Sequence, residues 1–169
     1  MTVQGSIIFI IAVVAACMDL VSTKIANKWI YLSWVVGLGY QIGCHGYRGI
    51  LLFLVGAVIP LLALAILFLF RMLGPGDIKL FSALGGIMTT GAIWKCMALS
   101  FLFGAALSLG FLIICGNIKS RLRYFTAYIS KTIQTGQITS YYRPGNQPEN
   151  IHFSIPILMS AMLFAGGFY

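Results

Sequence analysis

The chain has 169 residues, of which 60% are hydrophobic and only 8% are charged. Because an ordinary soluble domain is about a quarter charged, a soluble protein of this length could not cover so much apolar surface. The net charge of +8 would suit nucleic acid on a soluble chain, but basic residues also gather in the cytoplasmic loops of membrane proteins. The composition therefore argues against a nucleic-acid partner and predicts a single membrane domain over residues 1–169.

Apolar runs separated by polar stretches predict an all-α polytopic membrane protein with six transmembrane helices. No Lys or Arg precedes the first run, so we expect a retained helix rather than a signal peptide. The second run is short for a hydrocarbon core of about 30 Å, and its Gly39 and Gly43 form a GxxxG spacing that predicts close helix packing. The expected spans cover residues 5–19, 29–43, 50–70, 78–94, 97–115 and 151–168.

The polar segment over residues 116–150 is the only long one in the chain. Its apolar residues recur at three- and four-residue spacing with basic residues between them. An amphipathic helix on the membrane surface and an extension of the fifth span both fit this spacing. We expect the basic side chains of this segment, and those of the other basic loops, to contact anionic lipid headgroups.

The distribution of Lys and Arg predicts the orientation of these spans. Of the eleven, only Arg48 and Lys95 fall in the loops after spans two and four, and the other nine fall in the loops after spans one, three and five. Basic loops face the cytoplasm. The 116–150 segment is therefore expected in the cytoplasm and both termini outside.

The chain contains two aspartates, and this orientation brings both to the same face. Asp19 lies at the inner end of span one, and Asp77 lies at the inner start of span four. Ionisable groups at membrane depth cost free energy and usually mark function. The alternative is a capping role, with Asp77 as the N-cap of span four and Asp19 capping the polar connection after span one.

Two neighbouring carboxylates can share one proton, because like charges at close range resist joint ionisation. One carboxylate then activates a water, while the other hydrogen-bonds the scissile carbonyl and later protonates the leaving amine. This is aspartic proteolysis, which needs no metal or cofactor. Glycines beside Asp77 would admit a substrate backbone and take conformations closed to other residues. The cysteines form no CxxC pair, and His45 and His152 are expected as interface residues on opposite sides.

The stretch Gly74-Pro75-Gly76-Asp77-Ile78-Lys79 resembles the GxGDxK signature of the type IV prepilin peptidases, which are GxGD-type intramembrane aspartyl proteases. The stretch from Asp19 to Asn27 resembles the family's first-aspartate segment, in which a basic stretch and Ile-Pro-Asn follow the aspartate. Ala26 stands where the family usually has proline. The resemblance covers residues 5–115 and implies two catalytic residues, Asp19 and Asp77, with support from Gly74, Gly76, Lys79, Lys24 and Asn27.

The resemblance implies a multi-pass plasma-membrane enzyme that cuts the leader from type IV prepilins or prepilin-like proteins at the cytoplasmic membrane face. Larger members also methylate the new N-terminus and carry a segment with paired cysteines. The sequence here has no such segment, so we expect a compact, peptidase-only form. Two other functions fit the residues. One is a small proton- or cation-coupled transporter, and the other is a non-catalytic scaffold for a pilus or secretion system. Faces of small residues leave room for oligomers.

Overall fold

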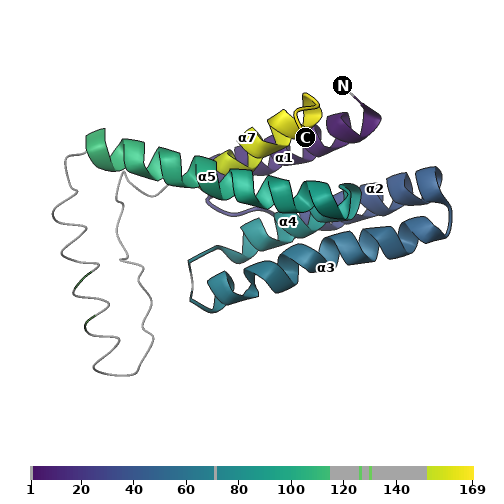
Figure 1. Cartoon of the computed structure of the whole chain (residues 1–169), viewed down its shortest axis with the longest axis horizontal. Coiled ribbons are helices and arrows are strands. Elements are labelled where there is room, and N and C mark those ends of the chain that lie inside the picture. The colour runs from purple at the N-terminus through teal and green to yellow at the C-terminus, as the bar shows by residue number, and fades with distance from the viewer. Residues whose placement is uncertain (1, 71, 115–125, 127–129, 131–151) are drawn as a thin grey trace.

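The computed structural model describes residues 2–70, 72–114, 126, 130 and 152–169. Over these residues the ordered elements are six helices without a strand, which confirms the all-helical class (Figure 1). They are α1 (Val3–Ser22), α2 (Asn27–His45), α3 (Arg48–Leu69), α4 (Pro75–Ile87), α5 (Thr90–Ile114) and α7 (Ser154–Ala165). The 116–150 segment lies outside the described residues, apart from positions 126 and 130, so its structure and location stay predictions.

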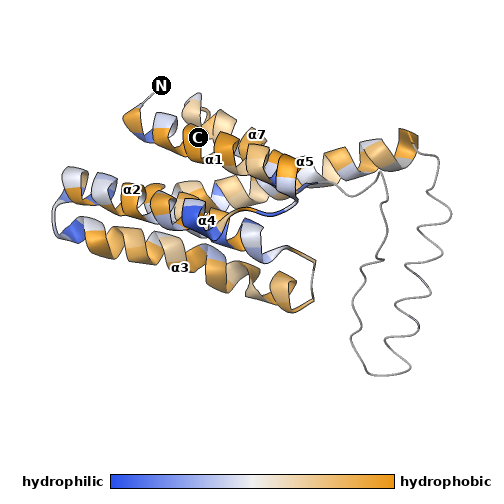
Figure 2. Ribbon diagram, turned by 180° about the vertical axis from the view of Figure 1, so that it is seen from behind, coloured by the Kyte–Doolittle hydropathy of each residue, from blue (hydrophilic) through white to orange (hydrophobic). Residues whose placement is uncertain are grey.

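Three helices in the described part of the chain are long and apolar enough to cross a membrane. They are α1, α3 and residues 90–111 of α5, and they correspond to the first, third and fifth predicted spans. Apolar residues dominate the helices, drawn in orange in Figure 2. These helices indicate a membrane protein, and the six-span arrangement remains a prediction.

The boundary between the fourth and fifth helices differs from the one expected. The sequence places it at Lys95, but α4 ends at Ile87 and α5 begins at Thr90. Met88 adopts an extended backbone, and the Thr89 hydroxyl then accepts a hydrogen bond of 3.4 Å from the Ala92 N–H. Threonine is a favoured helix N-cap, so this cap rather than the lysine charge sets the boundary.

Helices α2, α3 and α4 pack through glycines. Gly56 of α3 and Gly85 of α4 lie so close that a methyl group on either would collide with the backbone oxygen of the other. In α2 the close approach is made by Gly37, where a Cβ would lie 2.7 Å from the Ile87 side chain. A Cβ at Gly39 or Gly43 would meet nothing within 4 Å outside its own helix backbone. The GxxxG spacing permits close packing that these two glycines do not make among the described residues, because α2 turns a different face to its neighbours.

Helix α7 packs between α1 and α5 and runs antiparallel to both. Its first residue, Ser154, contacts Asp19 near the end of α1, while its last residue, Ala165, contacts Gly5 near the start. The Ser160 hydroxyl donates to the Cys96 carbonyl of α5 over 3.0 Å. This arrangement brings the start of α7 to the end of α1, where the candidate site lies.

Helix α5 extends beyond the rest of the bundle (Figure 1). A Cβ at Gly104 would lie 3.0 Å from the Phe153 ring, so this part of α5 is level with the start of α7. The helix continues to Ile114, about 15 Å farther at 1.5 Å per residue. Leu109, Phe111 and Ile113 on this extension are exposed, so apolar surface continues past the level of Asp19.

Candidate functional site

A cavity of about 470 Å³ lies where α1 ends and α4 begins. It is lined by the seven residues predicted for the site, together with three neighbours, Thr23, Ile25 and Pro75. The predicted residues are Asp19, Lys24, Asn27, Gly74, Gly76, Asp77 and Lys79. Two motifs from distant parts of the chain therefore line one cavity, and the roles of the individual residues stay predictions. We call this the cavity end of the bundle.

The Gly74–Lys79 stretch forms the start of α4. Gly74 is the N-cap, Pro75 is the first helical residue, and Asp77 is the third. Proline is favoured at the first helical position because its missing N–H would be unpaired there. The alternative that Asp77 is the N-cap is therefore wrong in detail. Its carboxylate still accepts a hydrogen bond from the backbone N–H of Gly74, as the third residue of a capping box does.

Gly74 leaves space for the Asp77 side chain rather than taking an unusual backbone conformation. Its φ of −71° and ψ of 147° are open to other residues, so the expectation of a special backbone conformation is wrong here. A Cβ at Gly74 would lie 3.1 Å from Oδ2 of Asp77, which is tighter than most packed contacts. The absent side chain lets the Asp77 carboxylate fold back over the helix start.

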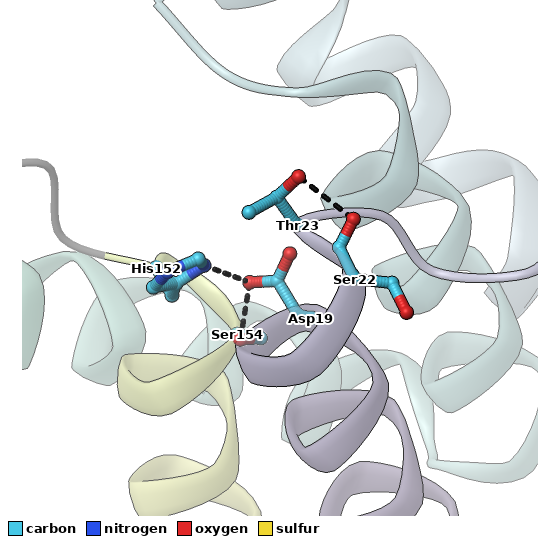
Figure 3. A network of polar contacts seen from close by, with 5 residues as sticks. All are labelled: Asp19, Ser22, Thr23, His152 and Ser154. Carbon is cyan, nitrogen blue, oxygen red and sulfur yellow. Dashed lines mark hydrogen bonds and ion pairs between the residues drawn. The ribbon is translucent and has the colours of Figure 1, made fainter. Parts of the chain in front are cut away.

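Asp19 lies in the last turn of α1. Thr23, with φ of 54°, closes the helix, and its N–H donates to the Asp19 carbonyl over 2.8 Å. The Asp19 side chain is only 13% exposed. Its Oδ2 accepts a hydrogen bond of 2.6 Å from the Ser154 hydroxyl and lies 3.1 Å from Nδ1 of His152 (Figure 3).

The two carboxylates influence each other electrostatically. Asp77 precedes the predicted span at residues 78–94, and its pKa is raised from 3.8 to about 6. Burial is the largest cause and the negative charge of Asp19 adds to it, while the Gly74 N–H and His152 act in the opposite direction. Asp77 therefore holds a proton at higher pH than an ordinary aspartate, as one member of a proton-sharing pair would.

A hydrogen bond links the two motifs. Nζ of Lys79, in the first turn of α4, donates to Oδ1 of Asn27, the first residue of α2, over 3.0 Å. Beside them, a Cβ at Gly76 would meet the Ile25 side chain at 3.7 Å, an ordinary van der Waals contact. The lysine amine is thus directed toward the polar connection after α1, where Lys24 also lines the cavity.

His152 and Ser154 were not expected at the site from the sequence. His152 was expected at a membrane interface, whereas its imidazole contacts Asp19, and Ser154 was not singled out although it is fully buried. A signal was available, because the orientation count that brings Asp19 and Asp77 together also brings the start of the last span to that face. The close contact itself depends on how α1 and α7 are rotated against each other.

Among the described residues, no group of three or more His, Cys, Asp or Glu side chains is arranged to hold a metal ion. Comparison of the chain with protein-family models, with curated proteins and with solved structures finds no match. The resemblance to prepilin peptidases therefore rests on the two motifs in the sequence and on no relative.

Proposed function

We propose that the protein is an intramembrane aspartic endopeptidase that removes the leader peptide of type IV prepilins or prepilin-like proteins. The observation that carries the proposal is the cavity shared by Asp19 and Asp77, which line it with the five residues predicted to support them. Two carboxylates beside one cavity are the equipment that metal-independent hydrolysis of a peptide bond requires.

The proposed reaction uses one proton shared between the two aspartates. The ionised carboxylate takes a proton from a water, and the resulting hydroxide adds to the scissile carbonyl carbon. The protonated carboxylic acid hydrogen-bonds the oxyanion and then gives its proton to the nitrogen as the C–N bond breaks. The products are a carboxylic acid and an amine, and the aspartate pair again holds one proton.

The position of the cavity supports a peptidase over a transporter. A transporter tends to hold its ion near the bilayer midplane, whereas this cavity lies at one end of the bundle. Beyond it, the fully buried Phe81, Leu84 and Ile87 fill the interior along α4. A cleavage site next to the apolar helix of a prepilin would reach such a cavity from the membrane surface. The cytoplasmic orientation is supported by the basic loops.

The test is to co-express the chain with a prepilin that carries its leader and to follow the size shift on processing. Asp19→Asn and Asp77→Asn should each abolish processing while the protein still accumulates in the membrane. Glu149→Gln makes the same carboxylate-to-amide change at the only other acidic residue and should process normally. Processing that survives either aspartate substitution would overturn the two-aspartate mechanism. Proton uptake by vesicles containing the protein, without processing, would favour the transporter.

A further inference from the structure

The two carboxylates of the cavity have different surroundings. Oδ2 of Asp19 accepts from the Ser154 hydroxyl over 2.6 Å, and Nδ1 of His152 lies 3.1 Å from the same oxygen. An ionised carboxylate can only accept hydrogen bonds, and such bonds to a charged group are short and strong. Both contacts therefore hold the Asp19 carboxylate in one orientation.

Asp77 lacks an equivalent pair of donors among the residues that the structure describes. Its carboxylate accepts from the Gly74 N–H at the start of its own helix. The nearest lysine in the sequence, Lys79, directs its amine to Asn27 instead. Burial and the charge of Asp19 both disfavour an ionised Asp77, and its pKa is raised to about 6.

We propose that His152 and Ser154 are positioning residues that orient Asp19 as the general base, which leaves Asp77 to carry the shared proton as the acid. This inference rests on the proposed peptidase function and assigns the two roles that the function leaves open. Asp19 takes the proton from water, and Asp77 gives its proton to the leaving amine. His152 and Ser154 touch Asp19 rather than the reacting atoms.

The geometry leaves one oxygen of Asp19 for the water. Both contacts fall on Oδ2, and Figure 3 shows the other carboxylate oxygen without a contact to the residues drawn. With Asp19 ionised, Nδ1 of His152 must carry a hydrogen, and the neutral tautomer protonated at Nδ1 suffices. The other charged groups that line this cavity are Asp77 and Lys79 from α4 and Lys24 after α1.

The experiment measures kcat and KM for cleavage of a prepilin by purified full-length protein in lipid nanodiscs. The variants are His152→Ala and Ser154→Ala, with His152→Asn and Ser154→Thr as conservative replacements. Loss of one donor to the Asp19 carboxylate should lower kcat roughly 10- to 100-fold with little change in KM. The conservative variants should restore part of kcat.

Ser160→Ala is the matched control, because it removes another buried hydroxyl of α7 that bonds the Cys96 carbonyl instead of Asp19. It should leave kcat unchanged. If Ser154→Ala fails to fold in a thermal unfolding assay, the partly exposed His152 supplies the test through His152→Asn and His152→Ala. A kcat unchanged in the His152 variants, or a rise in KM alone, would overturn the inference. Wild-type protein that does not cleave, or cleavage that survives Asp19→Asn, would instead overturn the proposed function.

Discussion

The two ends of α4 are held in different ways. Near Ile87, Gly85 meets the backbone of α3 and Gly86 lies against the Phe53 ring with no room for a methyl group. Near Asp77, the same helix faces α1 across a cavity of about 470 Å³. One short helix thus has a closely packed end and an end that borders open space.

Polar groups show the same contrast. At the packed end, Nε2 of Gln41 donates to the Gly86 and Ile87 carbonyls over 3.0 and 3.1 Å, and Nε2 of Gln4 donates to the Ile87 carbonyl over 2.8 Å. These side chains satisfy carbonyls that a helix C-terminus leaves unpaired. At the cavity end, Asp77 is bonded back to its own helix start. The contacts at the packed end hold α4 in place. The Asp77 carboxylate can therefore border the cavity with few hydrogen-bond donors around it.

The largest expected effect comes from filling the glycine contact between α3 and α4. Gly85→Leu should leave no stable folded protein, since its Cβ would meet the Gly56 backbone oxygen and backbone cannot shift as a side chain can. Overpacking typically costs about 1–3 kcal/mol of stability, and we expect the cost of Gly85→Leu to lie at or above the upper end of this range. Gly39→Leu is the matched control, because a Cβ at Gly39 would point into open space. Size-exclusion chromatography and thermal unfolding in detergent would check both, and equal behaviour would contradict the packing described.

The next effect concerns the glutamine at the packed end. Gln41→Leu removes both hydrogen bonds of the amide and leaves buried carbonyls with fewer partners. The free energy of unfolding should fall by about 1–3 kcal/mol. Ser82→Ala is the control, since the buried Ser82 hydroxyl has no hydrogen-bond partner in the described structure and its loss should be neutral. If Ser82→Ala destabilised the protein as much as Gln41→Leu, the role given to the amide would be wrong.

How much could be predicted from the sequence differs between these two ends. The cavity end was largely predictable, because its residues belong to two contiguous motifs and a count of basic residues assigned them to one face. The packed end was not, since GxxxG spacing marked Gly39 and Gly43 whereas Gly37 makes the contact. His152 and Ser154 were missed for the same physical reason. Contacts between helices depend on the rotation and depth of each helix, which no local pattern specifies.

A smaller effect tests the charge at the cavity end. The pKa of Asp77 is raised in the folded protein from 3.8 to about 6, so between these values the folded state binds more protons than the unfolded state. Stability should therefore fall as pH rises from about 4 to above 6. Asp77→Asn should flatten this part of the curve and raise the melting temperature at pH 7 by roughly 2–8 °C. Thermal unfolding across pH 4–8 measures it, with Glu149→Gln as the control that keeps the wild-type slope. If Asp77→Asn kept the wild-type dependence of stability on pH, the Asp77 carboxylate would not be buried as described.

The smallest effect concerns Ala26, which stands where the resembling family has proline. Ala26 is the N-cap of α2 with φ of −65° and ψ of 130°, and −65° is the value to which the proline ring fixes φ. Ala26→Pro should therefore keep processing unchanged and raise the free energy of unfolding by about 0.4–1 kcal/mol, because the unfolded chain loses freedom. Thr23→Pro is the contrasting variant. Its φ of 54° is closed to proline and its N–H donates to the Asp19 carbonyl, so it should destabilise the end of α1 and reduce processing. Thermal unfolding and prepilin processing check both variants. A loss of processing in Ala26→Pro would mean that the connection between α1 and α2 must bend during the reaction.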